Sequence, residues 1–301
     1  MRPARMSLTA GGVVVGPLRF PLGRAGSKSR PARLLYFTRS AAYLHSVVSR
    51  NGGGLAHSEA ILTELGRQCG VEVIATKDGR VFDGDLDRYD AIAFYTLGEL
   101  TQPSGEPTPP MSPRGKQRLL AAIAAGKGFL GFHSACDTFL SQGEQIDPYI
   151  AMIGGEFVTH DRRQVATVKV VAPDFPGMAG LGESFAMHEE WYALKNFAPD
   201  LHVILVQQPT GMVGACYRRP PFPITWARRH GKGRVFYTSL AHGENAWTHK
   251  IFQQIALGGL AWILGRVDAD LTPNLQQVTP DADQWPREHC SSHLLTPAAA
   301  F

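Results

Sequence analysis

Three short, uninterrupted apolar runs constrain the fold of this chain most. They are RLLYFT at 33–38, YDAIAFYT at 89–96 and GFLGF at 128–132, and each is followed by polar residues. Strands that are apolar on both faces are typical of a parallel sheet covered by helices on both sides. Helical patterns at 55–70, 114–125 and 146–153 alternate with strand patterns, which include a further strand at 71–76. We therefore predict an α/β fold with a flavodoxin-like, doubly wound, mostly parallel sheet.

The second half of the chain predicts further strands with a different pattern. VATVKVV at 165–171 alternates as a strand with one solvated face does, and an apolar strand follows at 202–206. The strands 224–230 and 234–240 flank Gly231-Lys232-Gly233, which predicts an added β-hairpin, and a long helix is expected over 246–264. Two segments are expected to be irregular: 154–163 on the surface, and 100–113, whose five prolines suit a rim over the sheet edge.

The two ends of the chain differ from this pattern in composition. Residues 1–32 are rich in Gly, Arg, Pro and Ser and predict a disordered basic arm, while 267–301 lack periodicity and predict an extended tail. The α/β domain is therefore expected over 33–266. Residues 1–33 carry seven basic residues and no acidic one, so the net charge of +4 comes from the arm. The rest of the chain is slightly acidic, which argues against nucleic-acid binding by the fold.

Composition also bears on location and partners. The longest apolar runs are far shorter than a membrane span of roughly 18 residues, so no membrane insertion is expected. Four scattered cysteines without CxxC spacing suit a reducing compartment, which predicts a cytoplasmic protein. The sequence leaves open an N-terminal targeting segment and a homo-oligomer.

Polar residues that suit catalysis follow several predicted strands or begin helices. His133, Ser134 and Cys136 come directly after the strand 128–132, and the others are His57, His160, Glu189, Glu190 and His242. Strand ends from distant parts of a doubly wound sheet meet at one edge, so several of these side chains should share a cleft. Imidazoles and a carboxylate serve acid–base chemistry, and they are equally the ligands of a divalent metal such as zinc. No fixed-spacing metal motif decides between the two.

The stretch Gly131–Ala135 also lies where a nucleophile elbow would, and His242-Gly243-Glu244 follows a late strand as in class I glutamine amidotransferases. The elbow position holds His133, however, and an imidazole cannot replace the thiolate in acyl transfer from glutamine. Cys136 lies three residues further on and Ser134 one residue off. Glutaminase and cysteine-protease activity are therefore disfavoured.

Taken together, four motifs resemble the ThuA-like family associated with trehalose utilisation, which has the class I glutamine amidotransferase-like fold without its cysteine nucleophile. They are GFHSACDTF at 131–139, GGEFVTH at 154–160, EEWY at 189–192 and GKGRVFYTSLAHGE at 231–244. The resemblance covers about residues 33–266 and implies processing of a disaccharide or keto-sugar. The proline-rich segment, the loop 218–223 and the tail depart from the family.

The resemblance also implies a set of site residues. His133 and His242 would be the proton-transfer or metal-binding pair, Glu190 the carboxylate base or third ligand, and Ser134 lies beside them. The expected metal ligands are the histidines His57, His133, His160 and His242. The expected activity is acid–base or metal-assisted chemistry on a small-molecule sugar. The alternative is a non-catalytic carbohydrate-binding or regulatory module on the same fold.

Overall fold

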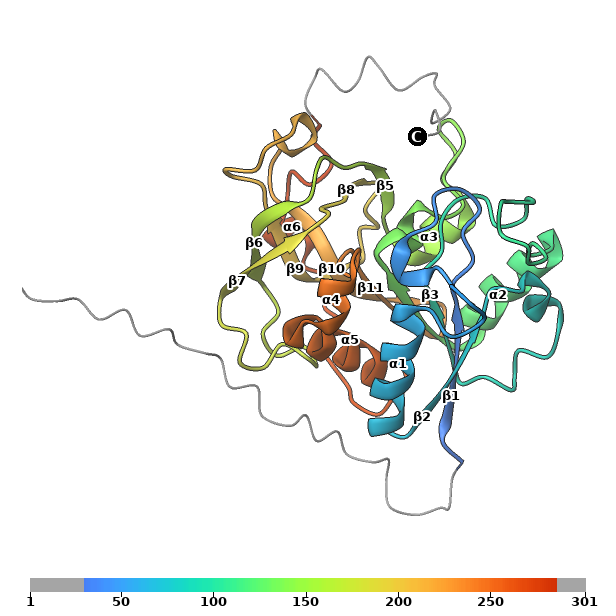
Figure 1. The fold of residues 1–301 in the computed structure, drawn as a ribbon. Helices are drawn as coiled ribbons and strands as arrows, with labels where there is room; N and C mark the ends of the chain where they lie inside the picture. Colours follow the sequence, from blue (N-terminus) through green and yellow to red (C-terminus); the bar gives the residue numbers. More distant parts are fainter. Residues whose placement is uncertain (1–29, 286–301) are drawn as a thin grey trace, which may run out of the picture.

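The fold is built on a twisted sheet of nine strands, and Figure 1 shows how the helices are arranged around it. The structure, a computed structural model, describes residues 30–285. Five neighbouring strands run parallel in the order β2 (Val71–Thr76), β1 (Ala32–Phe37), β3 (Ala91–Phe94), β4 (Gly128–Phe132) and β11 (Gly233–Thr238). The sheet continues antiparallel through β10 (Phe222–His230), β9 (His202–Gln208), β6 (Gln164–Val170) and β7 (Ser184–Glu189). The predicted flavodoxin-like α/β fold is confirmed.

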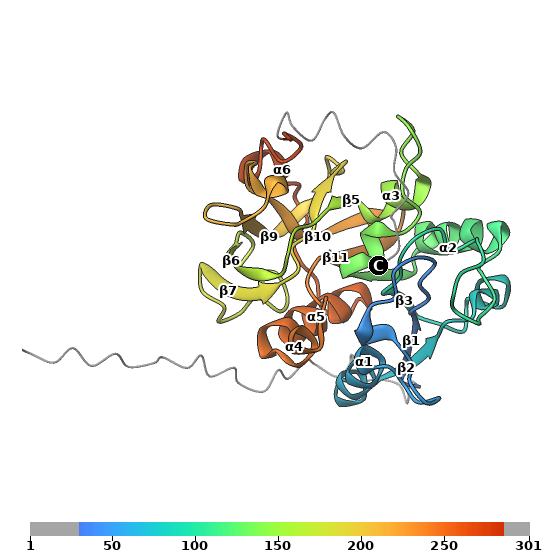
Figure 2. The ribbon, with the colours of Figure 1, turned by 45° about the horizontal axis from the view of Figure 1, so that its top comes forward.

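Helices cover both faces of the parallel half. Figure 2 shows α1 (His57–Gln68), α4 (Glu244–Thr248) and α5 (Lys250–Ile263) together on one side, and α2 (Pro113–Ala125) and α3 (Pro148–Ile153) on the other. All residues of β3 and β4 are consequently buried, which is why the sequence shows them as unbroken apolar runs. Local chemistry sets the helix ends: the Ser112 hydroxyl accepts from the Gly115 amide at the start of α2, and Gly126 ends it at φ 132°.

The predicted hairpin is present as β10 and β11, but it is not an appendage. Strand β11 lies in parallel beside β4, with Thr238 opposite Phe132, while β10 starts the antiparallel half of the sheet. The hairpin thus joins the two halves. Its position also means that the residues after β11 emerge next to the residues after β4.

Two predicted elements differ in the structure. The helix expected over 246–264 is broken at His249, whose side chain accepts a hydrogen bond from the Ile251 amide and caps α5. The segment 154–163, expected as a surface loop, contains β5 (Glu156–Thr159), which pairs with β8 (Ala193–Lys195) in a separate two-stranded sheet. Both differences arise from contacts with distant residues or from a side-chain cap that hydrophobic periodicity does not report.

The proline-rich segment 100–113 has neither helix nor strand, as predicted, but buried charges hold it in place. The Glu106 carboxylate accepts from Lys77 Nζ at 2.5 Å and from the Ser40 amide at 2.6 Å. Arg39, fully buried, donates to the carbonyl and hydroxyl oxygens of Thr108. The segment is therefore a fixed part of the rim.

The described residues extend beyond the predicted domain end at 266. The Asn274 side chain accepts from the Val203 amide at 2.6 Å, next to the short helix α6 (Leu275–Val278), and both Leu275 and Ala282 are buried. Residues up to 285 thus pack on the domain. The predicted arm, apart from residues 30–32, and the tail from 286 onward lie outside the described residues. In the part that is described, no helix has the length and apolar character needed to cross a membrane.

Candidate functional site

The candidate site begins where two neighbouring parallel strands end. His133 follows β4 and His242 follows β11 after a short turn. Because β4 and β11 pair in parallel, the two imidazoles meet, with His242 Nδ1 3.2 Å from His133 Nε2. The carboxyl edge of the sheet is where open α/β folds place their ligands.

His133 is held in an uncommon backbone conformation. Its φ is +42°, a left-handed value that costs a non-glycine residue on the order of 1–3 kcal/mol. Its Nδ1 lies 2.7 Å from the Ser239 carbonyl oxygen, which can only accept, so Nδ1 carries the proton. The Tyr237 hydroxyl donates to the His133 carbonyl. Nε2 faces His242 and the carboxylate described next, and it accepts a hydrogen bond in the neutral ring and donates one in the imidazolium.

Glu190 completes the centre of this cluster. Its Oε2 lies 3.0 Å from His242 Nδ1 and 3.3 Å from His133 Nε2. Burial acts to raise the pKa of Glu190, but the hydrogen bonds and charges of His133 and His242 outweigh burial and hold that pKa well below its ordinary value. The side chain is thus an ionised carboxylate between two imidazoles.

The neighbouring residue Glu189 fixes the backbone on both sides of the cluster. Its buried carboxylate accepts from the Glu190 amide at 3.0 Å and from the Ala241 amide at 3.0 Å. Ala241 has φ 98°, so the turn that precedes His242 needs such support. Glu189 therefore positions Glu190 and His242 relative to each other.

His45 is a fourth member that the sequence analysis did not find. It lies in the loop after β1, only 2% exposed, with its ring edge-to-face at 5.1 Å from the rings of both His133 and His242. Burial, followed by the neighbouring histidines, holds its pKa well below the usual value, so this ring is neutral. Its Nδ1 is buried and has no hydrogen-bond partner among residues 30–285.

The four side chains suit a divalent transition metal. His45, His133, Glu190 and His242 can each offer one ligand atom, and these atoms lie within 4.8 Å of one another. Three imidazoles and a carboxylate are donors that zinc accepts, and the unpartnered Nδ1 of His45 is a buried polar atom for which a ligand would account. The residues present therefore fit such an ion.

A cavity of about 600 Å³ opens beside the cluster. His45 and Glu190 line it directly, whereas the fully buried His133 lies outside its lining. Aromatic side chains form much of the remaining wall, with apolar and small residues between them; the lining includes Tyr43, Phe157, His160, Tyr192, Leu97, Leu140 and Asp137. The ring of His160 stacks on Tyr192 with centroids 5.8 Å apart. Aromatic walls around a few polar groups are typical of small-molecule sites.

The remaining predicted residues take different places. His160 joins the edge of the cluster, with Nδ1 3.5 Å from Glu190 Oε1. His57 is the first residue of α1, interacts electrostatically with Glu244 and is not part of the four-residue group; His45 takes the place expected for it. Ser134 is fully buried and its hydroxyl has no partner in the described part of the chain. Cys136 is also fully buried, and burial holds the pKa of its thiol well above the usual range.

A match to a protein family covers most of this fold and site. The family model of ThuA, described as trehalose utilisation, matches residues 46–263. The chain belongs to the ThuA family. Within the matched range lie His133, Glu190 and His242, while His45 precedes it by one residue.

Solved structures, two of them of ThuA-like proteins, share the fold at low sequence identity. A protein from Bacteroides uniformis is 17% identical with a TM-score of 0.58, over 80% of this chain and 94% of that one. One from Parabacteroides merdae is 14% identical with a TM-score of 0.59, over 80% and 93%. A cytoplasmic protein from Salmonella typhimurium is 14% identical with a TM-score of 0.50, over 77% and 98%. No match was found among curated proteins.

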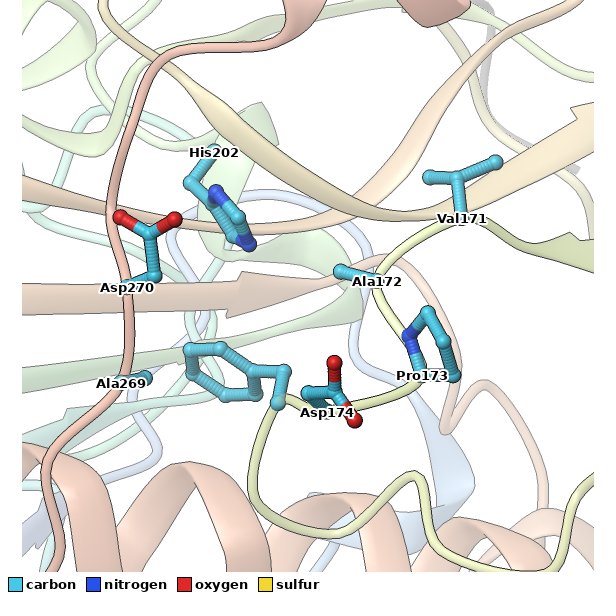
Figure 3. Close-up of a pocket in the computed structure, with 8 residues that line it drawn as sticks. Val171, Ala172, Pro173, Asp174, His202, Ala269 and Asp270 are labelled. Atoms are coloured by element: carbon cyan, nitrogen blue, oxygen red, sulfur yellow. The ribbon is translucent and has the colours of Figure 1, made fainter.

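A second, smaller cavity of this ThuA-family chain (Figure 3) shares no lining residue with the larger one. It has about 200 Å³ and is lined by His202, Asp174 and Asp270 among apolar residues. The Nδ1 of His202 lies 2.9 Å from the Thr272 carbonyl oxygen, and two bonds from Thr272 lower the pKa of Asp270. His202 and Asp270 thus have hydrogen-bond partners of their own. The larger cavity is therefore the stronger candidate for function.

Proposed function

We propose that this protein binds a disaccharide or keto-sugar in the larger cavity and transforms it by metal-assisted chemistry. The description of the family, trehalose utilisation, supports a carbohydrate as the substrate class. The cavity supports it independently, because the aromatic residues Tyr43 and Phe157 line it beside polar groups, and sugar rings have both apolar and polar surface. A volume of about 600 Å³ suits a ligand of that size.

The observation that carries the proposal is the convergence of His45, His133, Glu190 and His242 at the cavity. A general base works best when its pKa lies near the operating pH, whereas the pKa of Glu190 is held far below it. Glu190 is thus a poor base and a good ligand in this setting. This favours metal binding over free acid–base catalysis by the same carboxylate. A bound metal would polarise a carbonyl or hydroxyl oxygen of the sugar as a Lewis acid.

The chain's own residues supply orientation. His133 and His242 hold the Glu190 carboxylate at 3.3 and 3.0 Å, and the Ser239 carbonyl oxygen fixes the tautomer of His133. Second-layer contacts of this kind orient ligands and raise their basicity. His45 and Glu190 then face the substrate space, while His160 and Tyr192 form a stacked wall next to them.

The test combines metal analysis with turnover. Purified protein is analysed for bound metals and then incubated with trehalose, sucrose and their 3-keto forms, with and without added Zn²⁺ or Mn²⁺. We expect stoichiometric metal and consumption of at least one sugar by the wild type, and loss of both in His133→Ala. The control is His188→Ala, since His188 is an exposed residue of β7. Sugar binding without turnover under every condition would instead support a non-catalytic carbohydrate-binding module.

A further inference from the structure

A second carboxyl group faces the same cavity and takes no part in the histidine cluster. Asp137 ends the short 3-10 helix His133–Asp137 and lines the cavity with His45, His160 and Glu190. The side chain is half-buried, and no hydrogen bond or ion pair within residues 30–285 engages its carboxyl oxygens. An acidic side chain away from bulk water ordinarily has such a partner.

Hydrogen bonds fix the backbone around Asp137, so the fold itself sets the position of this residue at the cavity. The Gly98 amide donates to the Asp137 carbonyl at 2.8 Å, and the Phe139 amide donates back to the Gly98 carbonyl. The hydroxyls of Thr138 and Thr96 are hydrogen-bonded at 2.7 Å. Asp137 therefore lines the cavity from a fixed backbone position.

The nearby charges affect Asp137 and Glu190 in opposite ways. Glu190 has two imidazoles within hydrogen-bond distance, whereas the acidic neighbours of Asp137, Glu190 and Glu156, have partners of their own. Burial, together with the charges of Glu190 and Glu156, raises the pKa of Asp137 to about 8. A carboxyl group that lines a cavity, has no partner and keeps its proton near neutral pH is suited to act as a general acid.

We propose that Asp137 is a catalytic acid that protonates the bridging oxygen of a sugar held in the cavity. This rests on the proposed function and narrows it to cleavage of a glycosidic bond. The carboxyl O–H bond breaks as its proton passes to the bridging oxygen, which keeps the electron pair of the breaking carbon–oxygen bond. Water, the only co-reactant, supplies the hydroxyl group to the carbon and returns a proton to the Asp137 carboxylate.

The test compares two substrates that differ in their need for an acid. In the 3-keto form of trehalose the leaving sugar oxygen requires a proton, whereas in the 3-keto form of 4-nitrophenyl glucoside the nitrophenolate leaves without one. For Asp137→Asn we expect kcat on keto-trehalose to fall about 10²- to 10⁴-fold, the usual contribution of a general acid. On the nitrophenyl substrate, kcat of the same variant should fall by less than about tenfold.

Two controls separate the acid role from a structural one. Asparagine matches the shape and neutrality of a protonated aspartate, so the thermal unfolding midpoint of Asp137→Asn should stay near that of the wild type. Asp174→Asn makes the same change in the smaller cavity (Figure 3) and should leave both reactions unchanged.

The outcomes also distinguish this proposal from the proposed function. If the wild type cleaves both substrates and Asp137→Asn loses kcat equally on both, or on neither, the acid role is overturned and the proposed function stands. If the wild type consumes neither substrate with any metal, the proposed function fails and the acid role fails with it.

Discussion

At the scale of single residues, the surroundings of Cys136 argue against a reactive thiol in this fold. Its thiol is fully buried, 2.8 Å from the Tyr237 hydroxyl, and burial raises the pKa of the thiol well above the usual range. A thiol reacts as the thiolate, so this one should be inert. We expect Cys136→Ser to keep sugar turnover within about twofold of the wild type, because a residue outside the cavity lining touches no substrate.

Alkylation provides an independent measurement of the same point. Iodoacetamide followed by peptide mass spectrometry should label half-buried Cys69 before Cys136 in the native protein. Rapid labelling of Cys136 together with loss of turnover would contradict this view and restore a nucleophile to the site.

His45 provides the second prediction at this scale, which concerns metal affinity. Its neutral ring and unpartnered Nδ1 suit a ligand, whereas His57 lies in α1 outside the cluster. His45→Ala should therefore weaken Zn²⁺ binding by at least about tenfold, measured by calorimetry, and His57→Ala should leave it unchanged. If His57→Ala lowers affinity and His45→Ala does not, the ligand set predicted from the sequence is the better one.

The sequence identified three of the four cluster residues, two of them because of their positions. His133 and His242 come just after predicted strands, and strand ends in such a fold converge, whereas Glu190 was identified through the EEWY motif without a predicted strand before it. His45 was missed because it lies within a long loop that no periodic pattern locates. The role of Asp137 was missed for a different reason: it depends on the absence of a cationic partner, which only the packed structure reveals.

At the scale of elements, the proline-rich rim depends on one buried ion pair. Lys77 and Glu106 have side chains only 6% and 10% exposed, and the Lys77 ammonium also donates to the Thr38 carbonyl. Removing one partner leaves the other buried and uncompensated, which typically costs about 3–5 kcal/mol. Glu106→Gln should therefore lower the free energy of unfolding in urea by an amount near the lower end of that range, because the amide still accepts one hydrogen bond.

The matched control is Glu144→Gln, at an exposed position without an ion pair in the described chain. It should change stability by less than about 0.5 kcal/mol. If Glu106→Gln is equally neutral, the rim does not depend on the pair and the segment 100–113 is more loosely held than its contacts indicate.

Elements were predictable where one local signal determined them. The unbroken apolar strands, the helix predicted over 114–125 and the glycine turn of the hairpin all formed as expected. Strand β5 and the break at His249 were not predictable in the same way. The first depends on pairing with β8, about 35 residues away in sequence, and the second on a side-chain cap within a continuous apolar pattern.

For the whole molecule, the arrangement of the sheet could be predicted in its parallel half and only in part beyond it. Alternating strands and helices identified the parallel half, while the order β11-β10-β9-β6-β7 follows from long-range pairing that the sequence does not encode locally. This order has a functional consequence. It brings the end of β7, and with it Glu190, back to the edge where β4 and β11 end.

The cluster therefore ties together segments that follow β1, β4, β7 and β11, so a bound ion should stabilise the entire fold. A ligand that binds only the folded state stabilises it by RT ln(1 + [L]/Kd), about 2.7 kcal/mol at a hundredfold excess over Kd. Zn²⁺ should accordingly raise the thermal unfolding midpoint of the wild type by several degrees, and a chelator should reverse the rise. His133→Ala lacks one of the four ligand atoms and should show a much smaller rise, whereas His188→Ala should respond as the wild type does. An equal rise in His133→Ala would mean that the ion binds elsewhere on the molecule, because an ion at this site stabilises the fold only through the side chains that connect its two halves.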